Sequence, residues 1–329
     1  MKKVNLGLIG LGSIGKVHLR DCLDCRNARV VAVSDVSKRT LRLARKMGVK
    51  NTFTDYQELL RTPNLDAVIV SLPTYLHADC AQAAAEARKD IFLEKPLARN
   101  TDEGKRIVTV VRRNGVKLMI GYDMRYDPPF VALKRKILDG VLGEVLIAYG
   151  TLIGSGPFSE RAESGVPSPT PSWWFDSRLT GGGALIDLGC HLINLFRWYF
   201  GEICDIKSHF GHRFNMDSED NAICFARFEA GQLATINVGW FSQENQAKVE
   251  LYGTAKHAIA CHSHQSPIRT AIDLMTRSSR IRKGYFEEIR HFVHCVEQDL
   301  RPITSGEDAL KDLEAISEAY KSGIFSEHF

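Results

Sequence analysis

The stretch Val4-Asn5-Leu6-Gly7-Leu8-Ile9-Gly10-Leu11-Gly12-Ser13-Ile14-Gly15 decides the fold of this chain. Its apolar run Val4–Ile9 predicts a buried β-strand, and Gly10, Gly12 and Gly15 form the G-x-G-x-x-G pattern that joins a strand to a helix around a dinucleotide. The first glycine makes the tight turn, the second lets the backbone approach the pyrophosphate, and the third permits close packing of helix on strand. The phosphates are expected at the helix N-terminus, where Ser13 and Ile14 begin the helix.

A carboxylate follows this motif at the distance that a dinucleotide fold requires. Asp35 lies 20 residues after Gly15 (35 − 15), at the end of a predicted strand, where it can accept hydrogen bonds from the adenosine ribose. An acid here repels a 2′-phosphate and favours NAD. Ser37 and Arg39 follow at once and could hold such a phosphate, so NADP stays an alternative.

Strands and helices alternate as far as residue 121. Short apolar runs predict strands at 30–34, 67–72, 91–94 and 117–121, and helical patterns fill 37–47, 76–87 and 101–113. This alternation predicts a parallel sheet covered on both faces, which gives a Rossmann domain at 1–121.

The pattern changes after Tyr126. Longer runs of alternating apolar and polar residues predict strands at 145–152, 203–210, 222–228, 233–240 and 247–252. Helices are expected at 183–199, 286–297 and 307–320, and a long loop at 155–172. We therefore expect a second, α+β domain at 122–329 with a large, mostly antiparallel open sheet, whose last helix is able to pack back on the first domain.

Composition excludes several classes of protein. The chain has 329 residues, 44% of them hydrophobic and 25% charged, which is typical of a two-domain globular protein. A formal charge of +4 with interspersed basic residues argues against nucleic-acid binding, and no apolar run reaches the ~20 residues of a membrane span. Without a recognisable signal peptide, the chain is expected in the cytoplasm.

The eight cysteines are expected as reduced thiols, because they are scattered through apolar segments. Cys22 and Cys25 form a C-x-x-C without a second pair. Neither the group Cys261, His262 and His264 nor the pair His294 and Cys295 has the spacing of a zinc site, so no metal is predicted.

Lys95 follows the predicted strand 91–94 directly, within Glu94-Lys95-Pro96. Ligands of open parallel sheets bind outside the carboxyl ends of the strands, which places this lysine beside the nicotinamide. An amine there can polarise a substrate oxygen and assist proton movement. Pro96 is expected to fix the loop, with a cis bond as one way to do so.

Asp187 and His191 stand four residues apart in a predicted helix that Gly181-Gly182-Gly183 introduces. Residues at this spacing share a helix face, so both can converge on one ligand. Histidine suits reversible proton transfer because its unperturbed pKa is ~6.5.

Five stretches in this order carry a family resemblance: GLIGLGSIG (7–15), SLPTYLHAD (71–79), LEKPLARN (93–100), GYDMRYDP (121–128) and GGGALIDLGCHLINLFRWYFG (181–201). Together they resemble the Gfo/Idh/MocA family of glucose-fructose oxidoreductases, inositol dehydrogenases and their relatives. The resemblance covers most of the chain. It implies a Rossmann domain, a second domain with an open sheet, and a homodimer or homotetramer built on that sheet.

The resemblance also implies roles for individual residues. Lys95 and His191 are the expected catalytic pair, with Asp187 binding substrate. The expected cofactor-binding residues are Gly10, Gly12, Ser13, Ile14, Gly15, Asp35, Ser37, Arg39, Leu72, Pro73, Thr74, His77, Glu94, Lys95 and Tyr122. The expected substrate-binding residues are Lys95, Arg125, Trp174, Arg178, Asp187 and His191. Many members end the last motif with a second Asp where this sequence has Asn194.

The expected reaction is hydride transfer between NAD(P) and a carbinol or carbonyl carbon of a sugar, nucleotide sugar or inositol-type polyol. His191 takes the hydroxyl proton and Lys95 stabilises charge on the oxygen. Two alternatives remain: an NAD-dependent glycoside hydrolase that oxidises its substrate transiently, and a non-catalytic regulator that senses sugars.

Overall fold

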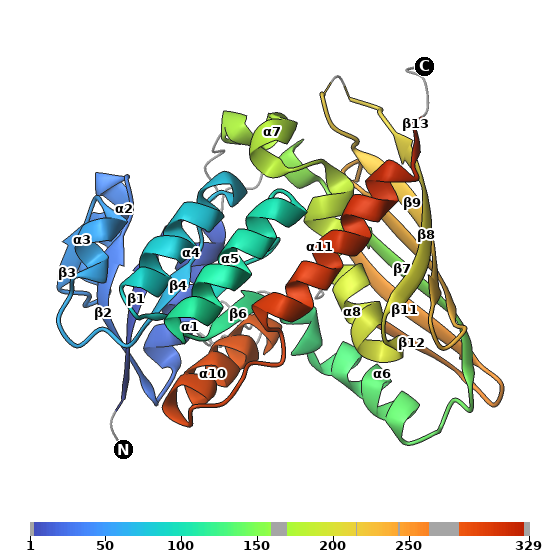
Figure 1. Cartoon of the computed structure of the whole chain (residues 1–329), viewed down its shortest axis with the longest axis horizontal. Coiled ribbons are helices and arrows are strands. Elements are labelled where there is room, and N and C mark those ends of the chain that lie inside the picture. The colour runs from blue at the N-terminus through green and yellow to red at the C-terminus, as the bar shows by residue number, and fades with distance from the viewer. Residues whose placement is uncertain (1–2, 159–169, 215, 243, 263–282, 326–329) are drawn as a thin grey trace. The chain divides into compact units, whose positions relative to one another are not determined.

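The computed structural model describes residues 3–158, 170–214, 216–242, 244–262 and 283–325. The chain forms two compact units, Met1–Asp123 with Arg282–Leu310, and Met124–Ile281 with Lys311–Phe329. Figure 1 shows the elements of each.

The first unit is built on a six-stranded parallel sheet in the order β3-β2-β1-β4-β5-β6. Its strands are β1 (Val4–Ile9), β2 (Ala28–Ser34), β3 (Asn51–Phe53), β4 (Ala67–Val70), β5 (Asp90–Glu94) and β6 (Leu118–Gly121). The strand order reverses between β1 and β4, so the carboxyl ends of these two strands flank the point where open α/β sheets bind their ligands. The predicted Rossmann fold is confirmed.

Helices connect these strands: α1 (Ser13–Asp24), α2 (Lys38–Lys46), α3 (Tyr56–Leu60), α4 (His77–Glu86) and α5 (Thr101–Asn114). A further helix of this unit, α10 (Lys283–Glu297), comes from the C-terminal part of the chain. Local chemistry sets the ends of α5, since Asn100 accepts a hydrogen bond from the Glu103 amide at 3.0 Å and Gly115 adopts φ +65°. α4 packs beside α5, and α1 beside α10 (Figure 1). α10 therefore contributes side chains to the environment of the glycine-loop helix.

The second unit holds a seven-stranded sheet in the order β12-β11-β7-β10-β9-β8-β13. Its strands are β7 (Val145–Ile153), β8 (Ile203–Gly211), β9 (Asn221–Phe228), β10 (Leu233–Gly239), β11 (Gln246–Gly253), β12 (His257–His262) and β13 (Ile324–Phe325). Within the described part of this sheet, the β10–β7 and β13–β8 pairs are parallel and the other pairs are antiparallel. The predicted, mostly antiparallel sheet is confirmed.

One face of this sheet packs against α8 (Cys190–Phe200), while α6 (Pro128–Leu138) lies near β12 and α11 (Gly306–Lys321) ends in this unit. Burial alternates strictly along β9, as expected for a strand with one buried and one exposed side. Among the described residues, the stretch Ser177–Phe200 is long and apolar enough to span a membrane, but 67% of its 18-residue apolar window is buried inside the protein, which is typical of a core helix.

Several elements escaped prediction. These are β3, α3, α6, β12 and β13, which are short or lack a clear apolar period. Cys261 and His262 lie on β12, and His264 lies outside the described residues. The part of the predicted loop at 159–169 also lies outside them. Cys22 and Cys25 are free, buried thiols on α1 and directly after it, and burial raises the pKa of Cys22.

Candidate functional site

The glycine turn has the shape that the motif predicts. Gly10 has φ +86°, and a Cβ there would lie 2.4 Å from the Ser71 carbonyl oxygen. A Cβ on Gly15 would lie 2.2 Å from the Gly10 carbonyl oxygen. A Cβ on exposed Gly12, however, would meet no protein atom within 4 Å. The fold itself therefore requires Gly10 and Gly15, whereas the open space at Gly12 fits the close approach of a pyrophosphate.

This difference predicts separable effects of two substitutions. Gly12→Ala is expected to weaken NAD binding by roughly 10-fold or more, with Tm close to that of the wild type, because the methyl group occupies only ligand space. Gly15→Ala should lower both Tm and NAD affinity. Titration calorimetry and thermal unfolding measure the two effects, and unchanged NAD affinity in Gly12→Ala would argue against phosphate binding at this turn.

Asp35 fixes the glycine turn as well as offering a ribose acceptor. Its Oδ2 accepts from the Leu11 amide at 2.7 Å and its Oδ1 from the Ser37 amide at 2.7 Å. Ser37 in turn caps α2 by accepting from the Thr40 amide, and Arg39 is exposed on the first turn of α2. The carboxylate thus ties the ends of β1 and β2 together, a role that sequence spacing does not reveal.

The loop after β4 holds Leu72, Pro73 and Thr74 at the carboxyl end of the sheet. His77 begins α4 with 1% exposure, and its two ring nitrogens lie 3.0 Å from the carbonyl oxygens of Pro96 and Leu72. Burial lowers the pKa of His77, so the ring is neutral and donates one of these hydrogen bonds. His77 therefore links the Leu72 and Pro96 loops, and its expected contact with the cofactor stays a prediction.

The Lys95 loop is held by its neighbours. The Lys95–Pro96 peptide is cis, as the sequence allowed, and Pro96 is buried while Lys95 is half-buried. Glu94 is 6% exposed; its Oε2 accepts from the Lys95 amide at 3.1 Å and its Oε1 pairs with His18 Nε2 at 2.6 Å. Glu94 was expected to bind cofactor, but its carboxylate is engaged within the protein and fixes the lysine main chain. Tyr122, expected to approach the nicotinamide, is 2% exposed.

Asp187 and His191 lie on one continuous helical segment that begins with a π-helical turn, Leu185–Gly189, and continues as α8. π-helical turns are rare in proteins, and those that occur are often found at functional sites. The Asp187 carboxylate accepts from the Trp240 indole at 3.2 Å, and Trp240 is 1% exposed. Both Asp187 and His191 are half-buried and thus partly accessible to a ligand. One helical segment therefore carries both a carboxylate held by Trp240 and an imidazole.

Glu219 anchors the start of this segment and was not predicted. Its carboxylate accepts from the amides of Gly183 at 3.1 Å and Leu185 at 2.8 Å, and from the Tyr320 hydroxyl at 2.8 Å. A Cβ on Gly183 would lie 1.8 Å from the Glu219 carbonyl oxygen, so glycine is required there. Burial raises the pKa of Glu219. No sequence signal pointed to this acid, because it lies 36 and 34 residues from the Gly183 and Leu185 amides that it caps.

The aromatic residues before this helix are placed differently from one another. The Trp174 ring lies 6.2 Å from the Trp240 ring, beside the indole that binds Asp187. Arg178 is exposed and pairs with Asp176 at 2.7 Å. Trp174 is thus close to Asp187 of the candidate site, whereas the Arg178 guanidinium forms an ion pair with Asp176, two residues before it in the sequence.

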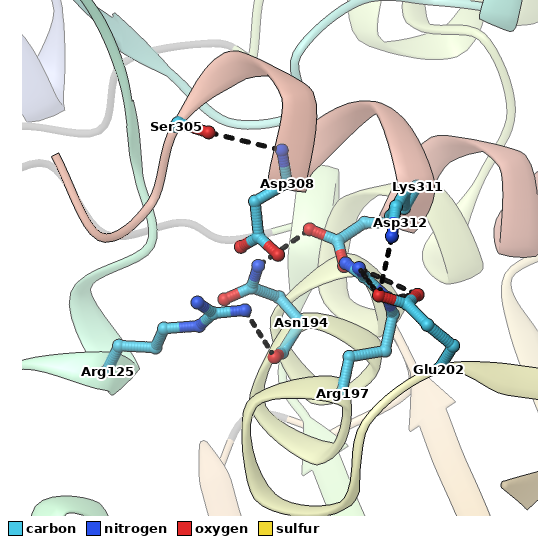
Figure 2. Close-up of polar contacts among 8 residues, drawn as sticks. All are labelled: Arg125, Asn194, Arg197, Glu202, Ser305, Asp308, Lys311 and Asp312. Carbon is cyan, nitrogen blue, oxygen red and sulfur yellow. Dashed lines mark hydrogen bonds and ion pairs between the residues drawn. The ribbon is translucent and has the colours of Figure 1, made fainter. Parts of the chain in front are cut away.

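Asn194 belongs to a buried polar network in the second unit (Figure 2). Its Nδ2 donates to Asp312 Oδ2 at 2.6 Å, and Arg197 pairs with Asp312 and Glu202. Arg125 is 5% exposed and donates to the Asn194 carbonyl oxygen at 2.9 Å. This bond makes Arg125 a support of α8, and its expected contact with substrate stays a prediction.

The network predicts a cost for an acid at position 194, the residue type that the resemblance implies there. Asn194→Asp places a second carboxylate against buried Asp312, with Arg197 as their shared cation, and is expected to destabilise the protein by about 3–5 kcal/mol. The new carboxyl must hold a proton in the fold, so its pKa is raised and the loss grows as pH rises. Denaturant unfolding at about pH 5 and about pH 8 measures this; equal losses at both would exclude carboxylate repulsion.

Comparisons with known proteins agree with the features of both units, the glycine turn and lysine loop of the first and the sheet and helices of the second. Residues 4–122 match the family model described as an oxidoreductase family with an NAD-binding Rossmann fold, and residues 130–259 match the GFO/IDH/MocA C-terminal domain. The chain is 28% identical to a myo-inositol 2-dehydrogenase of Thermotoga maritima over 93% of this chain and 92% of that protein. It is also 28% identical to an NAD-dependent scyllo-inositol 2-dehydrogenase of Bacillus subtilis, over 98% and 95%.

The fold is similar to a solved structure, the WlbA dehydrogenase of Bordetella pertussis, which was crystallised with NADH and UDP-GlcNAcA. That likeness has a TM-score of 0.82 at 21% identity and covers 98% of this chain and 95% of the other. The glycine turn, the lysine loop and the two matching family models lead to one conclusion: the chain belongs to the GFO/IDH/MocA family of NAD-binding oxidoreductases.

Proposed function

We propose that this protein is an NAD-dependent dehydrogenase of a ring polyol, with an inositol as the first substrate to test. The observation that carries the proposal is the open space at Gly12 within an otherwise closed glycine turn, together with the neighbouring Asp35 carboxylate. Relatives aligned over nearly the whole chain are named inositol dehydrogenases, which supports this class of substrate. Sugars and nucleotide sugars are the next classes to test.

In the proposed reaction, His191 accepts the proton of the substrate hydroxyl, because a neutral imidazole is the general base suited to neutral pH. Lys95 donates hydrogen bonds to the same oxygen and stabilises its developing charge. Asp187, held by Trp240, orients the substrate hydroxyls. NAD supplies the hydride acceptor when it is bound. The reverse reaction uses the same groups in the opposite direction.

A cofactor-absorbance screen tests the proposal. Purified protein is mixed with NAD or NADP and a panel of inositols, aldoses and nucleotide sugars, and nicotinamide reduction is followed. Reduction of NAD by at least one inositol is expected, with NADP less effective because Asp35 repels the 2′-phosphate. Glycoside cleavage without net reduction would instead indicate the hydrolase, and binding without either reaction would indicate a regulator.

We further propose a homodimer or homotetramer built on the open sheet of the second unit. Large apolar side chains share the exposed face of that sheet: Ile147, Tyr149, Ile223, Phe225, Leu233, Tyr252 and Ile259. Apolar surface of this extent is typical of protein interfaces. Light scattering should find an oligomer that Phe225→Lys dissociates, and a monomeric wild type would contradict the assignment.

The free cysteines support a reducing, cytoplasmic location.

A further inference from the structure

Behind the Lys95 loop, the first unit buries a carboxyl group that the proposed mechanism does not use. Glu288 on α10 is 0% exposed, and neither of its oxygens has a hydrogen-bond partner among the described residues. His18, Glu94 and Glu288 each place one polar atom within 4.8 Å of the others. His18 is equally buried, and its Nδ1 also lacks a partner in the described part of the chain.

A proton explains this cluster better than a metal ion. His18 Nε2 and Glu94 Oε1 are 2.6 Å apart, which is a hydrogen-bond distance. Two ligands of one zinc ion, each bound at 2.0–2.2 Å, lie about 3 Å apart or more. The imidazole and carboxylate are therefore joined directly to each other, and we assign no metal to them.

The charges around Glu288 are mostly negative. Glu94 ends β5, Asp123 follows β6, and Asp21 lies on α1. Burial and then the charges of these three carboxylates raise the pKa of Glu288 well above its ordinary value. The groups facing it also include His18 from α1, whose ring contacts those of Phe92 and Tyr285 edge-on. An ionised carboxylate in such a place is costly, whereas a neutral carboxyl offers the O–H donor that the cluster otherwise lacks.

We infer that Glu288 keeps its proton at neutral pH and is a positioning residue for Lys95. The neutral carboxyl leaves Glu94 free to accept from both His18 and the Lys95 amide. A negative charge on Glu288 would repel the Glu94 carboxylate and disturb the hydrogen bond by which Glu94 holds the Lys95 amide. The inference rests on the proposed role of Lys95, and it adds a buried proton on which the lysine's placement depends.

Infrared spectroscopy tests the proton without reference to catalysis. Wild type at neutral pH should show the C=O stretch of a neutral carboxyl group, which resists exchange and is lost in Glu288→Gln. Glu287→Gln is the matched control, since Glu287 is the preceding residue, pairs with Arg290 and is partly exposed; it should retain the band. If Glu288→Gln leaves the spectrum unchanged, the inference is overturned.

Kinetics test the positioning role. Glu288→Gln cannot ionise and is expected to keep most of the wild-type kcat at neutral pH, while Glu287→Gln should match the wild type. As the pH rises and Glu288 loses its proton, kcat is expected to fall about 10-fold or more further in the wild type than in Glu288→Gln, since small misplacements of a reacting group are costly. Profiles of kcat against pH with the same shape in the wild type and Glu288→Gln would overturn the role. A wild type inactive on every polyol would defeat the proposed function alone, because the infrared result still decides where the proton is.

Discussion

The His191→Ala variant is expected to turn over its substrate about 100-fold or more slowly than the wild type, with NAD affinity unchanged. The expectation follows from the position of His191 at the start of α8, four residues from an Asp187 that Trp240 holds in place. Removing the imidazole removes the proposed proton acceptor and leaves the helix itself intact. Steady-state kinetics on a substrate found in the screen measure kcat, and calorimetry measures NAD affinity.

His294→Ala serves as the matched control, since His294 is an exposed histidine on α10 of the other unit. It should behave as the wild type does. If His191→Ala retains full kcat on every substrate that the wild type oxidises, His191 has no part in proton transfer. A loss confined to KM would assign it to binding alone.

Lys95→Met should lower kcat on a comparable scale, roughly 100-fold or more, because it removes the cation that stabilises the substrate oxygen. Methionine keeps the length and apolar stem of the side chain, and the Glu94 bond to the residue 95 amide does not depend on the side chain. NAD affinity and Tm are therefore expected to stay near wild-type values. The loss should be smaller in Lys95→Arg, which keeps the charge but cannot release a proton at neutral pH.

The control for this experiment is Lys105→Met, an exposed lysine on α5. It should leave kcat unchanged. Restoration of part of the Lys95→Met activity by added small primary amines would show that the amine itself is the missing group. Wild-type kcat in Lys95→Met would remove Lys95 from the mechanism.

Many strands, helices and turns of the first unit could be predicted from the sequence, because residues close together in the chain determine them. The glycine turn needs Gly10 and Gly15 for steric reasons that act within the βα unit, and Asn100 and Gly115 set the ends of α5 by their own backbone chemistry. Contacts between side chains that lie far apart in the sequence could not be predicted in this way. The pairing of His18 with Glu94 spans 76 residues, and Glu288 joins it from the last quarter of the chain.

The second unit shows the same division. Alternating burial allowed its long strands to be predicted, but β12 and β13 are short and carry little pattern. The helix with Asp187 and His191 was expected, while its π-helical start and its anchor, Glu219, depend on a contact that only the folded sheet creates. Arg125 was expected to bind substrate, and Asn194 was noted as standing where the resemblance implies a second aspartate. In the structure, Arg125 donates to the Asn194 carbonyl oxygen on α8, and the Asn194 side chain donates to Asp312.

In the proposed reaction, hydride moves from a carbinol carbon directly to NAD while Lys95 and His191 act on the oxygen. The most direct test uses a substrate from the screen that carries deuterium on its carbinol carbons. We expect one deuterium on the reduced nicotinamide for each molecule oxidised, a slower rate than with the unlabelled substrate, and transfer that is about 100-fold or more slower in Lys95→Met and His191→Ala. Reduced cofactor without the label, or turnover with no reduced cofactor at all, would contradict it.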